Sequence, residues 1–312
     1  MKTISIIIPT YNEQENVNEL TTELMGLFEN ELAQYDYEII FIDNNSIDKT
    51  KDYLRLLCAA NKRVKAIFNI KNFGPFNSPY YGLFQGSGDC SILLCADFQD
   101  PIEMIPVFIS KWEEGAKIVC GIKALTRENK LMSFLRGLYY KLIKKMSDIE
   151  QIENFTGFAL YDKYFLNIIS KLDDPIPFLR GIVAEFGYKK VDVKYEQPCR
   201  KAGSSSFNLY RLYDAAMISF TSYTKIGLRI ATFSGFAMSF LSLTVALIYF
   251  VYKLLYWDRF DAGTTPLIVG CFVLGSAQLF FIGLIGEYIL SMNRRIMKRP
   301  LVIEAERINF EE

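Results

Sequence analysis

Residues 4–13 read ISIIIPTYNE, a run of branched apolar residues that ends in a proline and a polar cluster. Such a run is typical of a strand that is buried on both faces of a sheet. Residues 14–33 then carry apolar side chains at helical spacing. The alternation continues with strands predicted at 37–43, 64–69, 90–97 and 116–121, and with a helix that opens at Asp48. Strands that alternate with helices predict an α/β fold, with a mainly parallel sheet and helices on both faces.

Polar residues follow four of the predicted strands, at 9–13, 43–48, 71–74 and 97–100. In parallel sheets of this kind, ligands bind beyond the carboxyl ends of the strands. We therefore expect these four clusters to converge on one edge of the sheet and to form a binding site there.

The cluster CADFQDP, residues 95–101, carries the most chemistry. An extended backbone would point Asp97 and Gln99 toward the same side. A carboxylate and an amide oxygen at that spacing suit Mg²⁺ or Mn²⁺. Pro101 predicts the first turn of a helix that Asp100 caps. The alternative, in which Asp97 only ends a strand and Asp100 only caps a helix, stays open at this point.

The composition excludes several classes of site. The chain has no histidine, which removes Ser-His-Asp and Cys-His nucleophile systems and histidine metal sites. Its six cysteines form no CxxC pair, so a zinc site is not expected. The 35 basic and 35 acidic residues balance, and we expect no nucleic-acid partner. Neither a GxxxxGK loop nor a GxGxxG turn after the first strand is present, which disfavours kinases and standard dinucleotide enzymes.

Two stretches near the carboxyl end, residues 230–252 and 262–286, contain no charged residue. Each is long enough to cross a hydrocarbon core of about 30 Å as a helix, so the sequence predicts a two-helix transmembrane hairpin. Lysine and arginine residues flank the pair on the outer sides, which places both termini and the amino-terminal domain in the cytoplasm of a multi-pass protein. Two buried helices of a soluble protein are the alternative.

Two further segments have one apolar and one polar face. Residues 121–147 hold seven basic side chains and one acidic one, with apolar side chains at helical spacing, a pattern typical of an interfacial helix on anionic membrane lipids. An aromatic stripe from Phe207 to Phe220 leads into the first span. Either helix could instead pack against the amino-terminal domain. The predicted organisation is a cytoplasmic ligand-binding domain at 1–206, a juxtamembrane amphipathic helix at 207–228, two transmembrane helices at 229–290 and a cytoplasmic tail at 291–312.

Several segments, in this order and spacing, resemble the family 2 glycosyltransferases, and within them the polyprenyl-phosphate sugar transferases, which include bactoprenol glucosyltransferases and dolichyl-phosphate mannose synthases. These segments are SIIIPTYNEQENV (5–17), FIDNNSIDKT (41–50), NFG (72–74), ADFQDP (96–101), FLRG (178–181) and RKAGSSSF (200–207). The resemblance implies a glycosyltransferase-A-like domain with interfacial helices and the membrane hairpin. It implies the transfer of a sugar from a nucleotide sugar to a polyprenyl phosphate.

The resemblance also implies roles for individual residues. Asp97 and Gln99 would hold Mg²⁺ or Mn²⁺ on the donor diphosphate, and Asp97 and Arg200 would be the catalytic residues, with Arg200 against the phosphates. The residues implied in nucleotide-sugar binding are Pro9, Tyr11, Glu13, Asp43, Asn44 and Asp48. The chain departs from the family where Cys95 replaces a frequent aspartate and where residues 156–160 read TGFAL instead of GDFRL.

A polyprenyl phosphate needs no general base, because its nucleophilic oxygen is already ionised. The enzyme has to position two anionic phosphates and stabilise the leaving group. Basic residues should therefore surround the acceptor phosphate, and we expect this role for Lys123, Arg127, Lys130 and Arg136. Direct attack by the phosphate oxygen predicts inversion, with a β-linked product from an α-linked donor.

The favoured hypothesis is transfer of glucose from UDP-glucose to undecaprenyl phosphate at the cytoplasmic face of the bacterial inner membrane. GDP-mannose or UDP-GlcNAc as donor is an alternative, and so is a membrane-anchored protein that binds a sugar nucleotide without turnover. A processive polysaccharide synthase is disfavoured because the chain has no QxxRW motif. Small residues in the spans allow close helix packing, which is compatible with a homo-oligomer.

Overall fold

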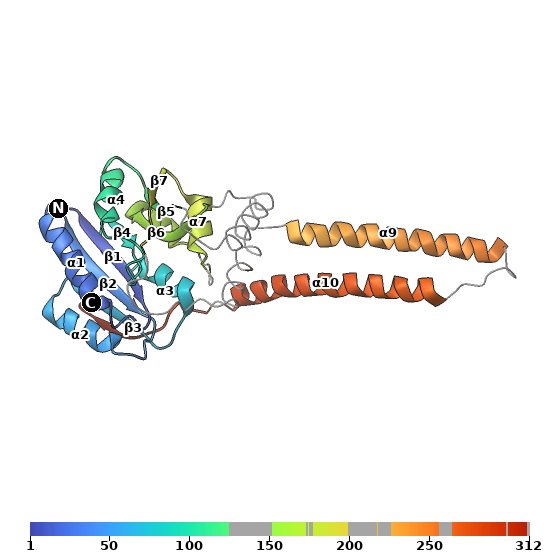
Figure 1. The fold of residues 1–312 in the computed structure, drawn as a ribbon, viewed down its shortest axis with the longest axis horizontal. Coiled ribbons are helices and arrows are strands. Elements are labelled where there is room, and N and C mark those ends of the chain that lie inside the picture. Colours follow the sequence, from blue (N-terminus) through green and yellow to red (C-terminus); the bar gives the residue numbers. More distant parts are fainter. Residues whose placement is uncertain are drawn as a thin grey trace.

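The computed structural model describes residues 1–124, 152–172, 174, 177–198, 217, 226–255, 264–297 and 299–310. Seven strands from the first two-thirds of the chain and one strand near its carboxyl end form an eight-stranded sheet with the strand order β7-β5-β6-β4-β1-β2-β3-β8 (Figure 1). The strands are β1 (Thr3–Thr10), β2 (Asp36–Asp43), β3 (Val64–Asn69), β4 (Cys90–Leu93), β5 (Ile118–Lys123), β6 (Phe155–Asp162), β7 (Lys190–Tyr195) and β8 (Glu304–Ile308).

The described strand pairs are mixed in direction, with a parallel centre. β1 pairs in parallel with β2 and β4, β2 with β3, and β5 with β7. The antiparallel pairs are β4 with β6, β5 with β6, and β3 with β8. The predicted α/β class and mainly parallel sheet are confirmed. β6 and β8 were not predicted as strands, and they supply the antiparallel pairs.

Helices cover both faces of the sheet, as predicted. One core places Ile4, Ile6 and Ile8 of β1 against α1 (Val17–Asn30), α2 (Thr50–Ala60) and α4 (Met104–Glu113). The other core places Ile7, Ile40 and Ile42 against α3 (Gly74–Gly82), α6 (Lys163–Ile169) and α7 (Leu179–Phe186). Because successive side chains of a strand point to opposite faces, the run ISIII can fill both cores.

The segment after β4 differs from the prediction. β4 ends at Leu93, and Phe98 has a left-handed backbone (φ 60°), so residues 95–99 are not extended. The helix predicted at Pro101 begins at Met104, with Glu103 in the cap position. Asp100 does not cap it, because its carboxylate accepts the backbone N–H of Cys95 (3.0 Å). This hydrogen bond closes a tight loop at the strand end.

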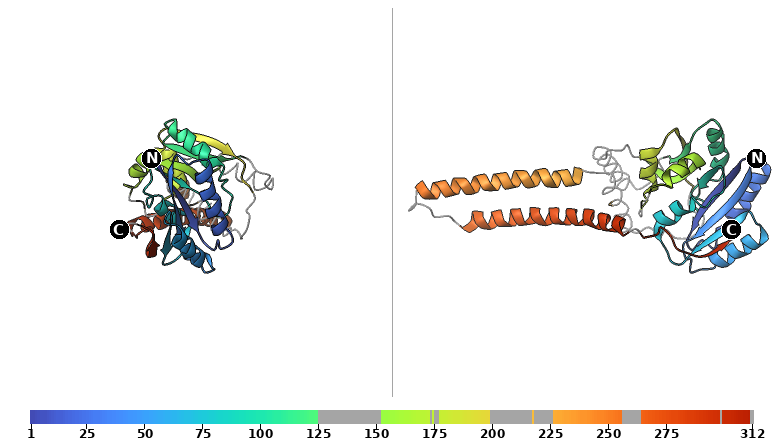
Figure 2. Two further views of the ribbon diagram at one scale, coloured as in Figure 1. Left: turned by 90° about the vertical axis from the view of Figure 1, so that its left-hand side faces the viewer. Right: turned by 180° about the vertical axis from the view of Figure 1, so that it is seen from behind.

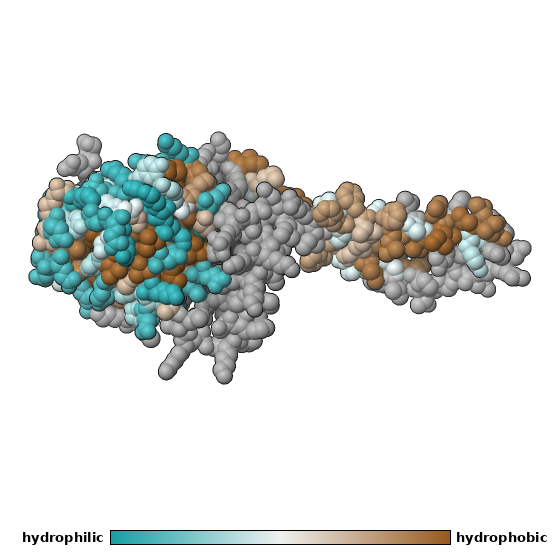
Figure 3. Space-filling model, turned by 90° about the horizontal axis from the view of Figure 1, so that it is seen from above, coloured by the Kyte–Doolittle hydropathy of each residue, from teal (hydrophilic) through white to brown (hydrophobic). Residues whose placement is uncertain are grey.

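Two long helices, α9 (Ile226–Leu255) and α10 (Thr264–Ile296), lie side by side and project from the domain (Figures 1 and 2). Their surface is mostly apolar, whereas polar residues cover much of the domain (Figure 3). Phe233, Phe236 and Phe280, for example, are at least two-thirds exposed. Among the described residues, Val273–Asn293 is one stretch that is long and apolar enough to cross a membrane, and Thr232–Leu241 is a shorter apolar one. Two membrane spans therefore remain a prediction.

Candidate active site

A cavity of about 340 Å³ opens at the carboxyl ends of β1, β2 and β4, the edge where the polar clusters were expected to meet. The antiparallel strand β6 begins at the same edge, and the first turns of α3 and α7 complete the wall. Six predicted site residues line this cavity: Pro9, Tyr11, Glu13, Asn44, Asp97 and Gln99. The sequence therefore located the cavity, and the roles of these residues stay predictions.

The loops after β1 and β2 are held together by a ladder of hydrogen bonds. The backbone N–H groups of Asn12 and Glu13 donate to the hydroxyls of Ser46 (2.8 Å) and Thr50 (2.9 Å). Asp48 accepts from the backbone N–H of Gln14 (3.3 Å) and, at the start of α2, from that of Thr50 (3.0 Å). Asp48 thus opens the helix region as predicted, although α2 begins two residues later, and it fixes the wall that Tyr11 and Glu13 line.

Asn44 ties a third loop to this wall. Its amide nitrogen donates to Asn72 Oδ1 (2.9 Å) and to the Gly74 carbonyl (3.2 Å). Its oxygen accepts the Phe73 backbone N–H (2.8 Å) and the Ser78 hydroxyl (2.9 Å). The residue is only 6% exposed. Asn44 therefore fixes part of the cavity wall by holding the loop that leads into α3.

Asp43 lies beside this network and is fully buried. Its carboxylate accepts hydrogen bonds from the hydroxyl and the backbone N–H of Ser46. Burial raises the pKa of Asp43 above its ordinary value, and these hydrogen bonds oppose the shift only in part. Asp43 is not among the described residues that line the cavity, and its nucleotide contact stays a prediction.

Asp97 and Gln99 both line the cavity because they lie in a turn, and not because they alternate along an extended strand as predicted. The Asp97 carboxylate accepts the backbone N–H of Gln99 (3.2 Å), and the left-handed Phe98 between them allows this geometry. Asp100 lies below, where burial raises its pKa to about 6, opposed by hydrogen bonds from Cys95. The Tyr195 hydroxyl also donates to Asp100 (3.3 Å). The turn, which these hydrogen bonds hold, therefore presents one carboxylate and one amide to the cavity.

This donor set fits a magnesium or manganese ion. Such ions prefer oxygen ligands and are often held by one or two carboxylates together with substrate phosphates. Asp97 and Gln99 supply a carboxylate and an amide oxygen on the cavity wall. Among the described residues, no group of three histidine, cysteine, aspartate or glutamate side chains could hold a metal by itself. A cation here would accordingly need oxygens from a bound ligand.

Sequence reasoning missed Arg180, in the first turn of α7, which also lines the cavity. Its guanidinium lies 6.0 Å from the Phe178 ring centre, and it forms no ion pair within the described part of the chain. The other charged residues on the described wall, Glu13, Asp97 and Asp100, are acidic. The motif FLRG contained this arginine, but only the position of α7 shows that it faces the cavity.

The predicted acceptor-phosphate residues are mostly outside the described part. Lys123 ends β5 and is half-buried, and it is not among the described residues that line the cavity. Arg127, Lys130 and Arg136 lie outside the described residues, as does the predicted catalytic residue Arg200. The amphipathic segments at 121–147 and 207–228 also fall largely outside them.

The sequence profile of the family described as "Glycosyl transferase family 2" matches residues 5–169, which contain most of this cavity wall. The chain belongs to this family. It is 32% identical over 304 residues to the prophage bactoprenol glucosyl transferase homolog of Escherichia coli, covering 96% of this chain and 97% of the relative. The bactoprenol glucosyl transferase of Shigella phage SfII is 31% identical over 309 residues, covering 96% of both chains. Family and relatives identify the protein as a glycosyltransferase.

A solved structure supports the fold. Glucosyl-3-phosphoglycerate synthase from Mycobacterium tuberculosis, in complex with Mn²⁺, UDP-glucose and glycerol 3-phosphate, matches with a TM-score of 0.50. The match covers 70% of this chain and 78% of that chain at 15% sequence identity. The glycosyltransferase-A-like architecture predicted from the sequence is therefore confirmed.

Proposed function

We propose that this glycosyltransferase moves one hexose from a nucleotide sugar to a polyprenyl phosphate at the cytoplasmic face of the bacterial inner membrane. Glucose from UDP-glucose and undecaprenyl phosphate are the favoured substrates. The cavity that joins Asp97 and Gln99 to Tyr11 and Glu13 at the sheet edge carries the proposal. Relatives named bactoprenol glucosyl transferases, which match nearly the whole chain, support the acceptor and the sugar.

The reaction forms one bond and breaks one. An ionised oxygen of the lipid phosphate attacks the anomeric carbon of the sugar, and the bond from that carbon to the nucleoside diphosphate breaks. The electron pair leaves with the diphosphate, and no proton has to be removed from the nucleophile. A chain without histidine can therefore run this chemistry, because positioning and charge stabilisation replace a general base.

The cavity residues divide these tasks. Asp97 and Gln99 would hold a magnesium or manganese ion, which would neutralise charge on the diphosphate. Arg180 lines the cavity from the first turn of α7 and can donate hydrogen bonds to phosphate oxygens. Tyr11 and Glu13 would contact the nucleotide from the wall that Asp48 braces. Asn44 would act as a positioning residue, since protein groups already use both atoms of its amide.

The proposal places α9 and α10 in the bilayer as a hairpin. The apolar stretch Val273–Asn293 supports one span directly. For α9 the support is the charge-free run of residues 230–252 and its exposed aromatic side chains. The basic residues that follow α10 would then lie on the cytoplasmic side, next to the domain.

The test is transfer to lipid in membranes that contain the full chain. Membranes are incubated with undecaprenyl phosphate together with one radiolabelled donor at a time, which is UDP-glucose, UDP-GlcNAc or GDP-mannose. The label that becomes linked to lipid is then measured. We expect label from UDP-glucose, and we expect Asp97→Asn or a chelator to abolish it. Asp52→Asn, on an exposed part of α2, is the matched control and should keep full activity. Sugar-nucleotide hydrolysis without lipid product, or full activity in Asp97→Asn, would contradict the proposal.

A further inference from the structure

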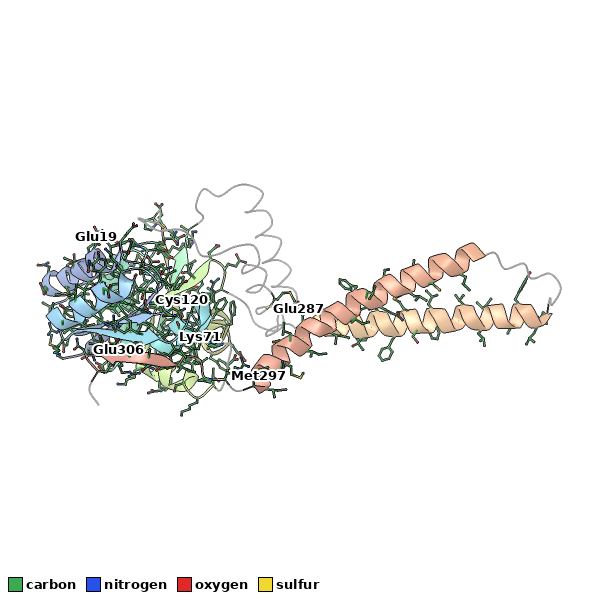
Figure 4. All side chains as sticks on the ribbon, turned by 90° about the horizontal axis from the view of Figure 1, so that it is seen from below. Glu19, Lys71, Cys120, Glu287, Met297 and Glu306 are labelled. Atoms are coloured by element: carbon green, nitrogen blue, oxygen red, sulfur yellow. The ribbon has the colours of Figure 1, made fainter. Side chains whose placement is uncertain are left out.

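The chain returns from α10 to the catalytic domain and forms β8 at the edge of the sheet. We call residues 299–310 the C-terminal strap. β8 pairs antiparallel with β3, and Leu301 and Phe310 pack against the core that contains α3. Figure 4 shows Met297 at the domain end of α10 and Glu306 on β8. The strap therefore connects the apolar helix pair directly to the sheet.

The strap is bound firmly at its far end. Asn309 has a left-handed backbone (φ 64°), and its amide donates to the carbonyls of Cys58 (2.7 Å) and Val64 (2.8 Å). Arg55 of α2 forms an ion pair with Glu306 (2.7 Å). Lys65 and Arg307 each place a cation on the ring of Phe310. These contacts fix the strap on β3 and leave little freedom along its length.

Its near end is attached to the cavity rim. The Leu301 carbonyl accepts from the Asn77 side chain (3.3 Å), and the Ile303 carbonyl accepts from the Ile70 backbone N–H (3.1 Å). Glu304 accepts a hydrogen bond from Tyr81. Asn77 and Tyr81 belong to α3, whose first residues line the cavity, and Ile70 precedes the loop that Asn44 holds.

Contacts continue from α3 across the cavity. The Phe76 ring packs edge-on against the Phe178 ring, with 5.9 Å between their centres, and Phe178 adjoins Arg180. α3 packs closely on the sheet, since a side chain at Gly82 would approach Ile7 and Ile42 within 3 Å. The strap, α3 and the rim are therefore joined by a continuous series of contacts.

The connection to the helix is short. α10 ends at Ile296 and the first anchored strap residue is Leu301. Five residues span at most about 17 Å, and Pro300 stiffens this connection further. The cavity rim thus cannot move far from the end of α10.

We propose that the C-terminal strap is a positioning element that holds the cavity at a fixed height and orientation above the membrane, where a lipid phosphate can enter it. This inference rests on the proposed function. A lipid acceptor cannot leave the bilayer surface, so the distance between surface and cavity decides whether its phosphate arrives. A water-soluble acceptor carries no such constraint.

The test lengthens the connection and leaves every strap contact in place. Gly-Ser or Gly-Ser-Gly-Ser is inserted between Met297 and Pro300 in the full chain, and the longer insert adds about 14 Å of reach. Reconstituted protein is assayed with undecaprenyl phosphate in vesicles and with a short-chain, water-soluble prenyl phosphate. We expect kcat/KM for the vesicle acceptor to fall about tenfold with the longer insert and less with the shorter. The KM for the nucleotide sugar and turnover of the soluble acceptor should not change.

The same four-residue insertion after Gly115, in an exposed turn before β5 and far from β8 in the strand order, is the matched control and should affect neither acceptor. Equal losses with both acceptors would show that the strap only completes the fold, and an unchanged vesicle rate would show that height does not matter. Either result overturns the inference. Failure of the wild-type chain to use any prenyl phosphate would instead overturn the proposed function.

Discussion

Asn44→Ala should separate the structure of the cavity from its chemistry. The substitution removes an amide that accepts from the Phe73 backbone N–H and the Ser78 hydroxyl and that donates to Asn72 and Gly74. Asn72 is exposed and can bind water instead, whereas Phe73 N–H and the buried Ser78 lose their acceptor. At about 1–2 kcal/mol for each buried group without a partner, we expect a loss of about 2–4 kcal/mol. The lost contacts are those that hold the rim loop.

Two measurements check this prediction. Urea unfolding followed by tryptophan fluorescence should show the loss of stability. The KM for the nucleotide sugar should also rise about tenfold or more, which corresponds to a loss of about 1.4 kcal/mol or more in binding free energy. Asn18→Ala, an exposed asparagine on α1, should change stability by less than about 0.5 kcal/mol and leave the KM unchanged. Wild-type stability and KM in Asn44→Ala would refute the view that this amide positions the rim.

Three further outcomes are expected. Arg180→Gln should lower kcat/KM about a hundredfold by removing a donor from the phosphates, while Arg180→Lys, which keeps the charge, should retain more activity; steady-state kinetics of both variants measure this. Burial acts to raise the pKa of Glu38, but hydrogen bonds from Lys65, Ser5 and Ser87 outweigh burial and hold that pKa below its ordinary value. The Glu38 carboxylate therefore stabilises the fold above about pH 4.5. Glu38→Gln should lower the free energy of unfolding by about 1–3 kcal/mol at pH 7. Urea unfolding at a series of pH values should show this difference from the wild type becoming smaller as the pH falls below about 4.5. The anomeric coupling in the NMR spectrum of the lipid product should show a β-linkage from an α-linked donor, and an α-linked product would contradict direct attack.

The parts of the fold that could be predicted from sequence are those with local apolar patterns. Runs such as ISIIIP and YEIIFID form buried central strands, and each run is recognisable without knowing its neighbours. β7 (KVDVKY) and β8 (EAERI) lie at the two edges of the sheet and are rich in charged residues. Their pairing depends on partners far along the chain, which a local pattern does not reveal.

In the site, too, the features that depend on local sequence patterns could be predicted, and those that depend on tertiary structure could not. The carboxyl ends of parallel strands correctly located the cavity, because strand direction alone fixes which edge they share. The turn that brings Asp97 and Gln99 together was missed, since it needs a left-handed Phe98 and a hydrogen bond from the Cys95 backbone N–H to the Asp100 carboxylate. Neither feature has a sequence pattern. Arg180 was overlooked for a related reason, because α7 reaches the cavity only through tertiary packing.

The charges on the described wall explain how the proposed substrates could meet. The carboxylates of Glu13, Asp97 and Asp100 would repel the negatively charged donor and acceptor phosphates. Among the described lining residues, Arg180 alone carries a positive charge that offsets this repulsion. A divalent cation on Asp97 and Gln99 would reverse the local sign where the diphosphate leaves. The acceptor phosphate needs its own cations, and the basic stretch at 121–147, predicted to lie on the membrane surface, would supply them. In this proposal the acidic wall and the basic segment would have separate tasks: one would hold the donor through a metal, and the other would bring the lipid phosphate to it.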